Sequence, residues 1–484
     1  MNTKLLKQKI LDLAIRGKLT QQLKSDGTAA DLLKQISEQK RESSSTLSSP
    51  RRRGSPSAQS EKTIIPLDKN EAPFEIPANW EWVRLGDIGK WQSGTTPSKS
   101  NSTYYKDGTI PWLNTGDLND GIINDIPKRV TEKALAETSL RLNEAGSVCI
   151  AMYGATIGKL GILSMPATTN QACCVCNNLK SFVNRMWLFY FLMNHKQEFI
   201  EAGFGGAQPN ISKEKIVSTI FPLPPLAEQR RIVEKIQEAF AEIDSIEKNK
   251  ELLKNHIKQA RQKILDLAIH GKLVPQNKTD EPASVLLERI TRDNPHYEKI
   301  EDEPFEIPEN WAWCRLGNIC DKLIDGDHNP PKGLDYTTEY MMLSSRNIND
   351  NGIVDLENVR YLSKDTFEEG NLRTKLEKGD ILFTSVGSLG RSCVFSGDGK
   401  YCFQRSVSVI HTSIYNKYLK YFFDSNYYQK YIVENATGTA QLGFYLEQMR
   451  KSFIAIPPFN EQSRIVAKIE ELFSTLDQME RNLV

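Results

Sequence analysis

The feature that most constrains this chain is an internal repeat that runs through almost its whole length. Residues Ile10–Ile15 read Ile-Leu-Asp-Leu-Ala-Ile, and the same six residues return 254 positions later at Ile264–Ile269. Residues Pro73–Pro77 read Pro-Phe-Glu-Ile-Pro and return 231 positions later at Pro304–Pro308. Because self-similarity at a long period is the signature of a repeat architecture, we expect two similarly folded halves.

The repeat is cyclic. A further set of matches lies 233 positions apart, and this offset and the 254-residue offset together exceed the chain length of 484 by three. The second copy therefore runs past the last residue and resumes at the first, so that 226–251 pairs with 459–484 and 255–273 pairs with 1–19. We expect a pseudo-twofold with two globular domains on two long antiparallel helical connectors, one continuous and one assembled from both termini.

Single residues extend the 233-residue match. Gln171 is matched with Gln404, and Gln208 with Gln441. The second pair stands in Gly-Ala-Gln and Thr-Ala-Gln contexts before each domain's final strand. Repetition favours a shared structural or backbone-contact role for that pair over base-specific recognition.

Residues 226–269 carry the strongest helical periodicity of the chain. Apolar side chains recur at alternating spacings of four and three, which is typical of a coiled-coil seam, and Lys250 alone interrupts them. Prolines 222, 224 and 225 end the preceding strand, and Gly17 and Gly271 are predicted helix C-caps. The seam residues that we place on the connectors are Ile232, Ile236, Ile243, Ile246, Ile257, Ile264, Ile465, Ile469, Leu472 and Leu476.

Composition and repeat together predict the domain organisation. Residues 41–62 carry eight serines and almost no apolar side chains, which indicates a disordered linker. The predicted segments are 1–24 as the N-terminal part of a split connector, 41–62 as linker, 64–225 as the first domain, 226–273 as the central connector, 276–303 as a partly helical linker, 304–458 as the second domain and 459–484 as the C-terminal part of the split connector.

Each domain is expected to be α+β. Short apolar runs closed by glycine, at Gly146–Gly154 and Gly379–Gly387, predict strands. The aromatic stretches Trp187–Leu192 and Tyr418–Phe423 have helical amphipathicity, and core packing explains them better than base stacking.

Charge and hydropathy exclude several classes of protein. The formal net charge is +1, so any polyanion site must be a local patch. Mean hydropathy is −0.46, which is typical of a globular protein without membrane spans. No run approaches the ~18 apolar residues of a membrane span, and charges interrupt the N-terminal apolar residues where a secretory signal is unbroken. We expect a cytoplasmic protein without membrane contact.

Motifs that would carry chemistry are incomplete. The turn Gly154–Leu160 has three residues between its glycines and Leu after Lys159, where a phosphate loop has four and Ser or Thr. Asn329-Pro-Pro-Lys332 resembles the Asn-Pro-Pro-aromatic loop of adenine methyltransferases but lacks the aromatic residue. No Ser-His-Asp order and no HExxH helix occurs. We therefore expect no catalytic centre.

Two polar clusters contain residue types that can bind a metal ion. Cys173, Cys174 and Cys176 lack a second Cys or His pair at ligand spacing, so reduced strand cysteines are favoured over zinc ligands. Asp325-Gly-Asp327-His328 has metal-ligand chemistry, but a turn in which Asp side chains cap backbone amides is the better interpretation. No metal site is predicted.

The cyclic repeat, the element Pro-Leu-Pro-Pro-Leu-Ala-Glu-Gln-Arg-Arg-Ile-Val at 222–233 and its counterpart at 456–466 together resemble the specificity subunits of Type I restriction-modification systems. The resemblance covers nearly the whole chain. It implies a non-catalytic subunit with two target recognition domains, each of which recognises half of a bipartite, asymmetric sequence of double-stranded DNA. The helical connectors would also dock two methyltransferase subunits, and two restriction/translocase subunits would join for cleavage. S-adenosylmethionine, ATP and Mg would be bound by those partners, with adenine as the methylated base.

Polar loops of the two domains supply the candidate DNA contacts. The segment Ser93–Ser98 resembles the domain-opening Ser-Gly-x-Thr-Pro of the family, and hydroxyls, amides and basic side chains suit phosphate and base-edge contacts. In the first domain the candidates are Lys90, Ser93, Gly94, Thr95, Thr96, Ser98, Lys99, Asn114, Thr115, Tyr153, Lys159, Asn170 and Gln171. In the second domain they are Asp325, Gly326, His328, Ser345, Arg346, Asn347, Ser385, Arg391, Gln404 and Arg405.

Two alternatives stay open on the sequence alone. The near-zero charge of both domains allows a scaffold in which the coiled coil is the function and the domains bind protein. The incomplete Asn329 loop allows a stand-alone adenine methyltransferase.

Overall fold

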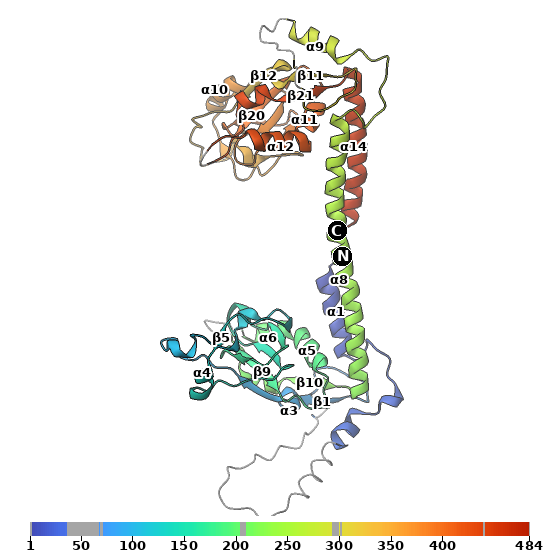
Figure 1. Ribbon diagram of the computed structural model, residues 1–484, viewed down its shortest axis with the longest axis vertical. Helices are drawn as coiled ribbons and strands as arrows, with labels where there is room; N and C mark the ends of the chain where they lie inside the picture. The colour runs from blue at the N-terminus through green and yellow to red at the C-terminus, as the bar shows by residue number, and fades with distance from the viewer. Residues whose placement is uncertain are drawn as a thin grey trace, which may run out of the picture. The chain divides into compact units, whose positions relative to one another are not determined.

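The computed structural model describes residues 2–35, 67, 71–203, 210–292, 300, 303–438 and 441–483. The chain forms two compact units, Met1–Lys248 and Asn249–Val484, and each is described by itself (Figure 1). The predicted linker 41–62 and Gln208 lie outside the described residues. Within the part that is described, no helix is long and apolar enough to cross a membrane.

The first unit is an α+β fold, whose described residues form three sheets. A five-stranded sheet has the order β2-β9-β6-β7-β4, a three-stranded sheet has the order β5-β3-β8, and β1 pairs with β10. The strands are β1 (Glu81–Arg84), β2 (Lys90–Ser93), β3 (Ile110–Leu113), β4 (Gly121–Ile123), β5 (Arg129–Val130), β6 (Val148–Ala151), β7 (Leu160–Leu163), β8 (Thr168–Thr169), β9 (Cys173–Asn177) and β10 (Ile220–Leu223). The helices are α1 (Thr3–Ile15), α3 (Leu85–Ile88), α4 (Glu132–Glu137), α5 (Arg185–Asn194), α6 (Lys196–Gly203), α7 (Lys213–Ser218) and the first part of α8 (Leu226–Ile269).

The second unit repeats this plan. Its sheets have the orders β12-β20-β17-β18, β16-β13-β19, β11-β21 and β14-β15. The strands are β11 (Ala312–Arg315), β12 (Cys320–Asp325), β13 (Tyr340–Leu343), β14 (Ile348–Asn349), β15 (Gly352–Ile353), β16 (Arg360–Tyr361), β17 (Ile381–Thr384), β18 (Ser392–Val394), β19 (Lys400–Phe403), β20 (Val407–Thr412) and β21 (Phe453–Ile456). The helices are the second part of α8, α9 (Ala283–Thr291), α10 (Lys364–Thr374), α11 (Asn416–Asp424), α12 (Asn426–Asn435), α13 (Leu446–Lys451) and α14 (Phe459–Asn482).

Strand pairing shows that the two units share most of their topology, although β4 joins the five-stranded sheet while its counterpart β15 pairs with β14 instead. The antiparallel pair β1 and β10 places Trp82 opposite Pro222, and β11 and β21 place Trp313 opposite Ala455. The parallel pair β3 and β8 recurs as β13 and β19. The α+β fold expected from the repeat is therefore confirmed.

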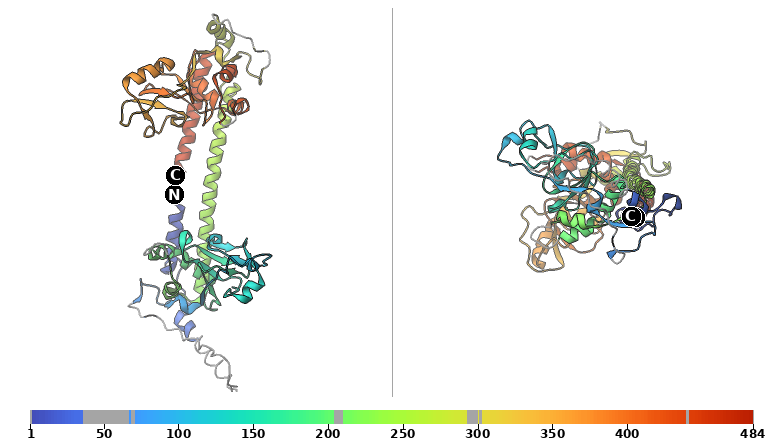
Figure 2. Two further views of the ribbon diagram at one scale, coloured as in Figure 1. Left: turned by 90° about the vertical axis from the view of Figure 1, so that its left-hand side faces the viewer. Right: turned by 90° about the horizontal axis from the view of Figure 1, so that it is seen from below.

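Contacts between the connector helices repeat at the cyclic offsets. In the first unit Lys7 of α1 pairs with Asp244 of α8 and lies over the ring of Phe240. In the second unit Arg261 of α8 pairs with Asp477 of α14 and lies over the ring of Phe473. The helices of each pair are antiparallel, and each pair lies side by side within its own unit (Figure 2). Each unit thus combines one helix of either kind, as the cyclic repeat predicts.

The repeated Glu-Gln motif at the start of each long helix is structural. Glu228 is fully buried and accepts hydrogen bonds from the Trp80 indole and the Asn79 amide, both at 3.0 Å. The Gln229 amide donates to the carbonyls of Phe182 and Pro224, each at 2.9 Å. A buried polar group must be hydrogen-bonded to be tolerated, so this motif fixes the start of α8 to the body of its unit.

The same motif recurs in the second unit. Gln276 donates to Glu461 at 2.6 Å, and the Gln462 amide donates to the Pro457 carbonyl at 2.9 Å. Glu461 and Gln462 are both fully buried. The Tyr415 amide donates to the Gln462 side chain at 2.9 Å, so the start of α14 is also fixed to its own unit, although Glu461 bonds Gln276 where Glu228 bonds Trp80 and Asn79.

Gly17 and Gly271 end their helices as predicted. Both have φ +66°, and the amides of Lys18 and Lys272 each donate at 2.8 Å to a carbonyl five residues back. This is the bond pattern of a glycine C-cap. In both units the glycine lies against the proline of the Pro-Phe-Glu-Ile-Pro repeat.

The seam is buried only where the partner helix covers it. Ile232, Ile236, Ile243 and Ile257 of α8 and Ile465 and Ile469 of α14 are buried, whereas Ile264, Leu472 and Leu476 are half-buried. Ile246 is 46% exposed and Leu253 41% exposed, contrary to a continuous seam. The reason is helix length. Residue Thr3 in the first turn of α1 bonds Glu247, and near the end of α14 Glu480 lies 3.5 Å from Arg261, one turn of α8 beyond the buried Ile257.

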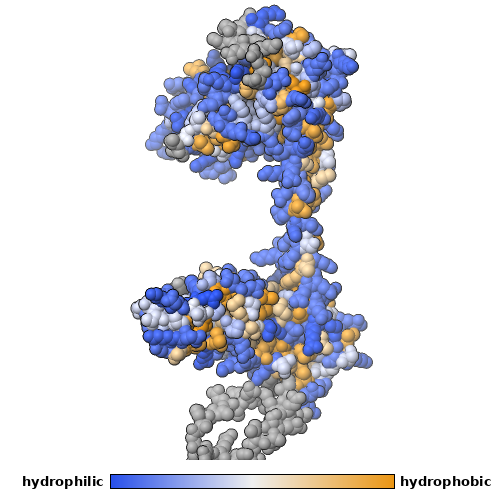
Figure 3. Space-filling model, viewed as in Figure 1, coloured by the Kyte–Doolittle hydropathy of each residue, from blue (hydrophilic) through white to orange (hydrophobic). Residues whose placement is uncertain are grey.

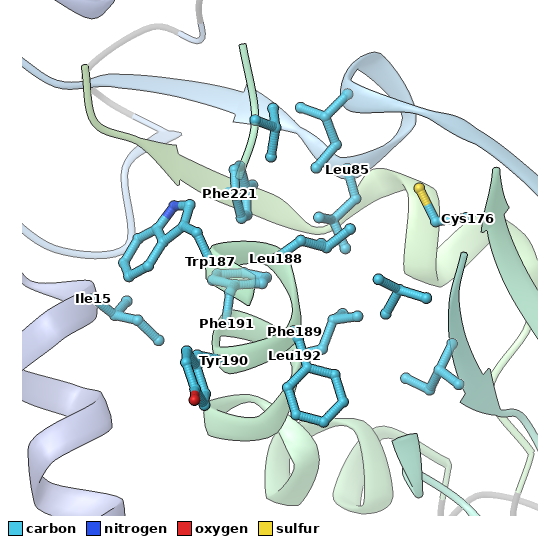
Figure 4. Packing of buried hydrophobic residues seen from close by; sticks show 14 of the residues in the cluster. Ile15, Leu85, Cys176, Trp187, Leu188, Phe189, Tyr190, Phe191, Leu192 and Phe221 are labelled. Atoms are coloured by element: carbon cyan, nitrogen blue, oxygen red, sulfur yellow. The ribbon is translucent and has the colours of Figure 1, made fainter. Parts of the chain in front are cut away.

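Aromatic side chains form the core of each unit. All residues from Trp187 to Leu192 of α5 are buried, and they pack between the strands and Ile15 of α1 (Figure 4). In the second unit Tyr418, Phe422 and Phe423 of α11 have the same role. The expectation that these stretches pack the core rather than stack on bases is confirmed. The cysteines of β9 are free and buried, and burial raises the pKa of Cys174 and Cys176 to about 12.

Candidate nucleic-acid interface

Four loops meet at one edge of the first unit. They follow β2, β3, β6 and β8, and backbone hydrogen bonds join them. The Gly94 amide donates to the Cys173 carbonyl at 3.1 Å, the Thr95 amide to the Thr169 carbonyl at 2.9 Å, and the Asn170 amide to the Leu113 carbonyl at 2.9 Å. Segments far apart in the sequence thereby form one surface, which we call the first loop edge.

Side chains of the first loop edge bond one another. The Thr96 hydroxyl donates to the Gln171 side-chain oxygen, and the Tyr153 hydroxyl donates to the Gln171 carbonyl at 2.8 Å. The side-chain amide of Asn170 donates to the side-chain oxygen of Asn114 at 3.4 Å. Burial, with Cys174 nearby, raises the pKa of Tyr153, so its hydroxyl remains a donor at neutral pH. The structure brings these five predicted residues together.

The remaining predicted residues of this unit lie around that cluster or away from it. Ser93, Ser98 and Lys99 are exposed along the loop that follows β2, and Thr115 is half-buried in the turn after β3. Lys159 closes the turn between β6 and β7, where its carbonyl accepts from Ala151 at 2.8 Å.

Lys90 is not brought to the loop edge. It begins β2 opposite Asn177, at the end of the strand farthest from Gly94. Its counterpart in the second unit, Lys322 opposite His411, forms an ion pair with the buried Asp380 at 2.6 Å.

Gly94 and Gly326 serve the packing of the loop. A Cβ at Gly94 would lie 2.2 Å from the Thr169 carbonyl oxygen, and one at Gly326 would lie 2.3 Å from the Phe403 carbonyl oxygen. Only glycine allows so close an approach of two backbones. Both glycines therefore place the residues that follow them, and their contact with DNA stays a prediction.

The second unit has the equivalent edge, formed by the loops after β12, β13, β17 and β19, and we call it the second loop edge. The Gly326 amide donates to the Val407 carbonyl at 2.9 Å, the Asp327 amide to the Phe403 carbonyl at 2.7 Å, and the Gln404 amide to the Leu343 carbonyl at 2.9 Å. A pocket of about 180 Å³ opens here, with a lining that includes Asp327, His328, Ser345, Gln404, Arg405 and Gln441.

These hydrogen bonds correct the predicted match between Gln171 and Gln404. Asn170 and Gln404 both donate to the last carbonyl of the parallel neighbour strand, so these two residues are equivalent. Gln171 is therefore equivalent to Arg405 and not to Gln404. The shared letter Gln suggested an offset of 233, whereas the offset here is 234.

Asp325 organises the loop after β12. It accepts from His328 at 2.7 Å and from Arg373 of α10. Partial burial opposes ionisation, but the hydrogen bonds from Arg373 and His328 hold the pKa of Asp325 below its ordinary value. Sequence reasoning missed Arg373, since it lies 48 residues beyond Asp325 and carries no motif.

The loop interpretation of the Asp325–His328 cluster is supported. Asp327 accepts from the Asn329 amide at 2.8 Å, as expected of a capped turn. Among the described residues, no group of three His, Cys, Asp or Glu side chains is placed to hold a metal ion.

Several predicted residues of the second unit point inward. Asn347 is buried and donates to the Asp355 carbonyl at 3.0 Å, and Ser385 is buried with its hydroxyl 2.5 Å from that of Ser408. Their predicted DNA contacts are replaced by structural roles, because a buried side chain cannot reach a duplex. Ser345 is buried at the pocket wall, while Arg346 and Arg391 are exposed.

Both loop edges lie on polar units. The visible face of each unit is mainly hydrophilic, with small hydrophobic patches between the polar residues (Figure 3). Hydroxyls, amides and a few cations line the first loop edge, whereas the second adds Arg405 and His328 beside Asp325 and Asp327. This chemistry suits hydrogen bonding to a polar ligand with both donors and acceptors.

A family model decides what this architecture is. The model described as Type I restriction modification DNA specificity domain matches residues 77–255 and again 308–483. The chain belongs to this family. It is a specificity subunit with two target recognition domains, the non-catalytic part of a Type I restriction-modification complex that recognises the DNA target.

Curated specificity subunits are similar along much or all of the chain. The EcoBI subunit of Escherichia coli is 28% identical, over 66% of this chain and 65% of the relative. The EcoEI subunit of Escherichia coli is 24% identical over 99% of this chain and 90% of the relative, and the MjaIX subunit of Methanocaldococcus jannaschii is 22% identical over 85% and 90%.

Solved structures share the fold of this specificity subunit. The crystal structure of the HsdS subunit from Thermoanaerobacter tengcongensis has a TM-score of 0.52 at 18% identity, covering 86% of this chain and 96% of that one. A chain from a study of assembly and conformational transition in the Type I restriction-modification system has a TM-score of 0.55 at 20% identity, covering 85% and 94%.

Proposed function

We propose that each target recognition domain uses its loop edge to recognise one half of a split, asymmetric sequence in double-stranded DNA. The observation that carries this proposal is a shared frame with different side chains. Equivalent backbone hydrogen bonds hold both loop edges, yet Thr95, Tyr153 and Gln171 of the first correspond to Asp327, Val386 and Arg405 of the second. A shared frame supports one way of approaching a duplex, and different side chains support different half-sites.

Phosphate and base contacts are divided among these side chains. Exposed hydroxyls and cations such as Ser98, Lys99 and Arg346 suit phosphate oxygens, which position the protein without carrying sequence information. Amides and the Arg405 guanidinium suit base edges, which carry it.

The long helices are proposed to dock two methyltransferase subunits, and two restriction/translocase subunits would complete the complex. The predicted docking residues Ile232, Ile236, Ile465 and Ile469 are buried within their own units, so they hold the chain together rather than contact a partner. Leu252 of α8 instead is 50% exposed and lines a groove of about 770 Å³ with His256 and Gln259. Leu253 beside it is 41% exposed, and this pair of adjacent exposed leucines on a polar helix supports a docking site there.

The cofactors of the reaction are proposed to belong to the partners. S-adenosylmethionine would be bound by the methyltransferase subunits, and ATP and Mg by the restriction/translocase subunits, with adenine as the methylated base. The specificity subunit contributes the choice of sequence.

Methylation mapping tests the proposed function. Genomic DNA would be sequenced for modified bases from cells that express this chain with its methyltransferase subunit, and from cells that lack the chain. We expect one split, asymmetric motif that appears only with the chain. A stable purified complex that adds no motif would contradict DNA recognition and favour a scaffold, and methyl transfer by the chain alone would favour an enzyme.

A further inference from the structure

The hydrogen-bond register aligns the two loop edges position by position. Asn170 corresponds to Gln404 and Gln171 to Arg405, because the parallel pairs β3 with β8 and β13 with β19 end at the same point. The first of these positions carries an amide in both units. The second carries an amide in one unit and a guanidinium in the other. Such a pair of positions is suited to one shared and one distinguishing contact.

The side chains at the second loop edge are free to bind a ligand. Gln404 is half-buried and Arg405 exposed, and both line the pocket of about 180 Å³. Among the residues that the structure describes, neither side chain has a hydrogen-bond or ion-pair partner, although Arg373 and His328 nearby are both engaged by Asp325. The Gln404 amide and the Arg405 guanidinium can therefore both bond a ligand that enters the pocket.

From this placement we infer that Arg405 recognises a guanine in the second half-site, with Gln404 bonding the adjacent base edge. The inference rests on the proposed function. The guanidinium is a planar fork whose two donors match the O6 and N7 acceptors of guanine in the major groove, and no other base presents that pair. Gln171, at the same position of the first unit, carries an amide and reads a different base of the first half-site.

The test uses the complete complex of this chain with its methyltransferase subunit. Methylated motifs are mapped for the wild type, Arg405→Gln, Arg405→Lys and the control Arg289→Gln, which changes an exposed arginine of α9 that pairs with Glu281. Binding of each purified complex is also measured on duplexes that carry every base at each half-site position. We expect Arg405→Gln to reduce the preference for guanine at one position of the second half-site by about 10- to 100-fold.

The two Arg405 variants separate base recognition from charge. Arg405→Lys keeps the charge and loses the fork, so overall affinity should persist while the guanine preference falls. The first half-site should be unaltered in every variant, and Arg289→Gln should match the wild type throughout. Since Arg405 is exposed, the thermal transition of the chain should not move.

Two results would overturn the inference while leaving the proposed function intact. One is an unchanged second half-site in both Arg405 variants. The other is an equal loss of affinity for all bases at every position, which marks a phosphate contact. A wild-type complex that yields no split motif would instead remove the proposed function, and the inference with it.

Discussion

At equivalent buried positions the two units use different residues for the same task. In the first unit the Ser147 hydroxyl donates to Asn177 at 2.8 Å. In the second unit the equivalent residue is Asp380, which is fully buried and pairs with Lys322 at 2.6 Å and His411 at 2.7 Å. The network is neutral in the first unit and ionic in the second. Removing a single partner of a buried ion pair leaves an uncompensated charge.

Asp424 gives the second unit a stability that depends on pH. Burial raises its pKa to about 6, although Lys420 and Ser392 donate hydrogen bonds to it. The folded chain therefore holds this proton more tightly than the unfolded chain does. The contribution to stability is complete below about pH 4 and is lost as the pH rises through about 6.

We expect the wild type to lose about 2 to 3 kcal/mol of unfolding free energy relative to Asp424→Asn between about pH 4 and pH 7. Denaturant unfolding of both proteins across that range measures the difference. A difference that stays constant with pH would contradict the assignment.

Single residues also mark how far the sequence could predict the site. The polar loops were found because hydroxyls, amides and cations follow predicted strands. Which of these side chains point inward was not predictable, since a turn residue such as Asn347 bonds the backbone as readily as it faces solvent. The match of Gln171 with Gln404 was wrong because identical letters outweighed a register that only hydrogen bonds reveal.

Two glycines link the connector helices to the domains. At Gly17 and Gly271 a Cβ would lie 2.3 Å from the ring of Pro77 or Pro308, and φ is +66° at both. We expect Gly17→Ala and Gly271→Ala each to lower the unfolding free energy by about 2 to 4 kcal/mol, from backbone strain together with overlap. Gly116 is a control for the substitution itself, because it is exposed, its φ lies outside the left-handed region and nothing lies within 4 Å of its Cβ position.

Gly116→Ala should change the unfolding free energy by less than about 0.5 kcal/mol, because it introduces neither backbone strain nor overlap. Chemical denaturation of the three variants checks this order. Equal losses at all three positions would show that neither the backbone conformation of Gly17 and Gly271 nor their contact with proline carries stability.

Substitutions in the α8 groove and in the buried core should affect different properties: assembly with the partner in the first case and stability of the chain in the second. Leu252→Asp is expected to abolish assembly with the methyltransferase subunit, since it puts a charge into an apolar contact, while the thermal transition of the free chain is unchanged. Ile236→Ala, which removes a fully buried side chain, should lower the unfolding free energy by about 2 to 5 kcal/mol. Co-purification and thermal unfolding measure the two effects. Assembly that survives Leu252→Asp would move the docking site elsewhere.

The periodicity of apolar residues predicted the helices better than it predicted which helix residues are buried. The spacing of α8 gave its helical character and its start after Pro225, because both depend on local sequence. Exposure of Ile246 and Leu253 depends on where α1 and α14 end, which the apolar pattern does not encode. The parallel pairing of β3 with β8 joins segments more than 50 residues apart and left no local signal.

The boundary between the units falls inside α8, between Lys248 and Asn249. The part of α8 before it corresponds to α14 in the repeat, and the part after it corresponds to α1. Lys7 with Asp244 and Arg261 with Asp477 are therefore the same ion pair in two copies. Each unit is therefore one contiguous copy of the repeat, which begins with an α1-type helix, continues through the domain and ends with an α14-type helix.

Whole-domain exchange tests whether recognition is modular in the same way. Replacing residues 64–225 by the corresponding domain of another specificity subunit keeps α1, α8 and the buried Glu228, and these hold any domain with the same Trp and Asn partners. Because the hydrogen bonds of each loop edge, as far as the described residues show them, lie within its own unit, we expect the first half-site to change while the second half-site and the gap persist. Methylation mapping of the exchanged complex reports all three at once. A change in both half-sites would mean that the domains recognise DNA jointly, and a changed gap would mean that the domain itself, rather than the helices, sets the spacing.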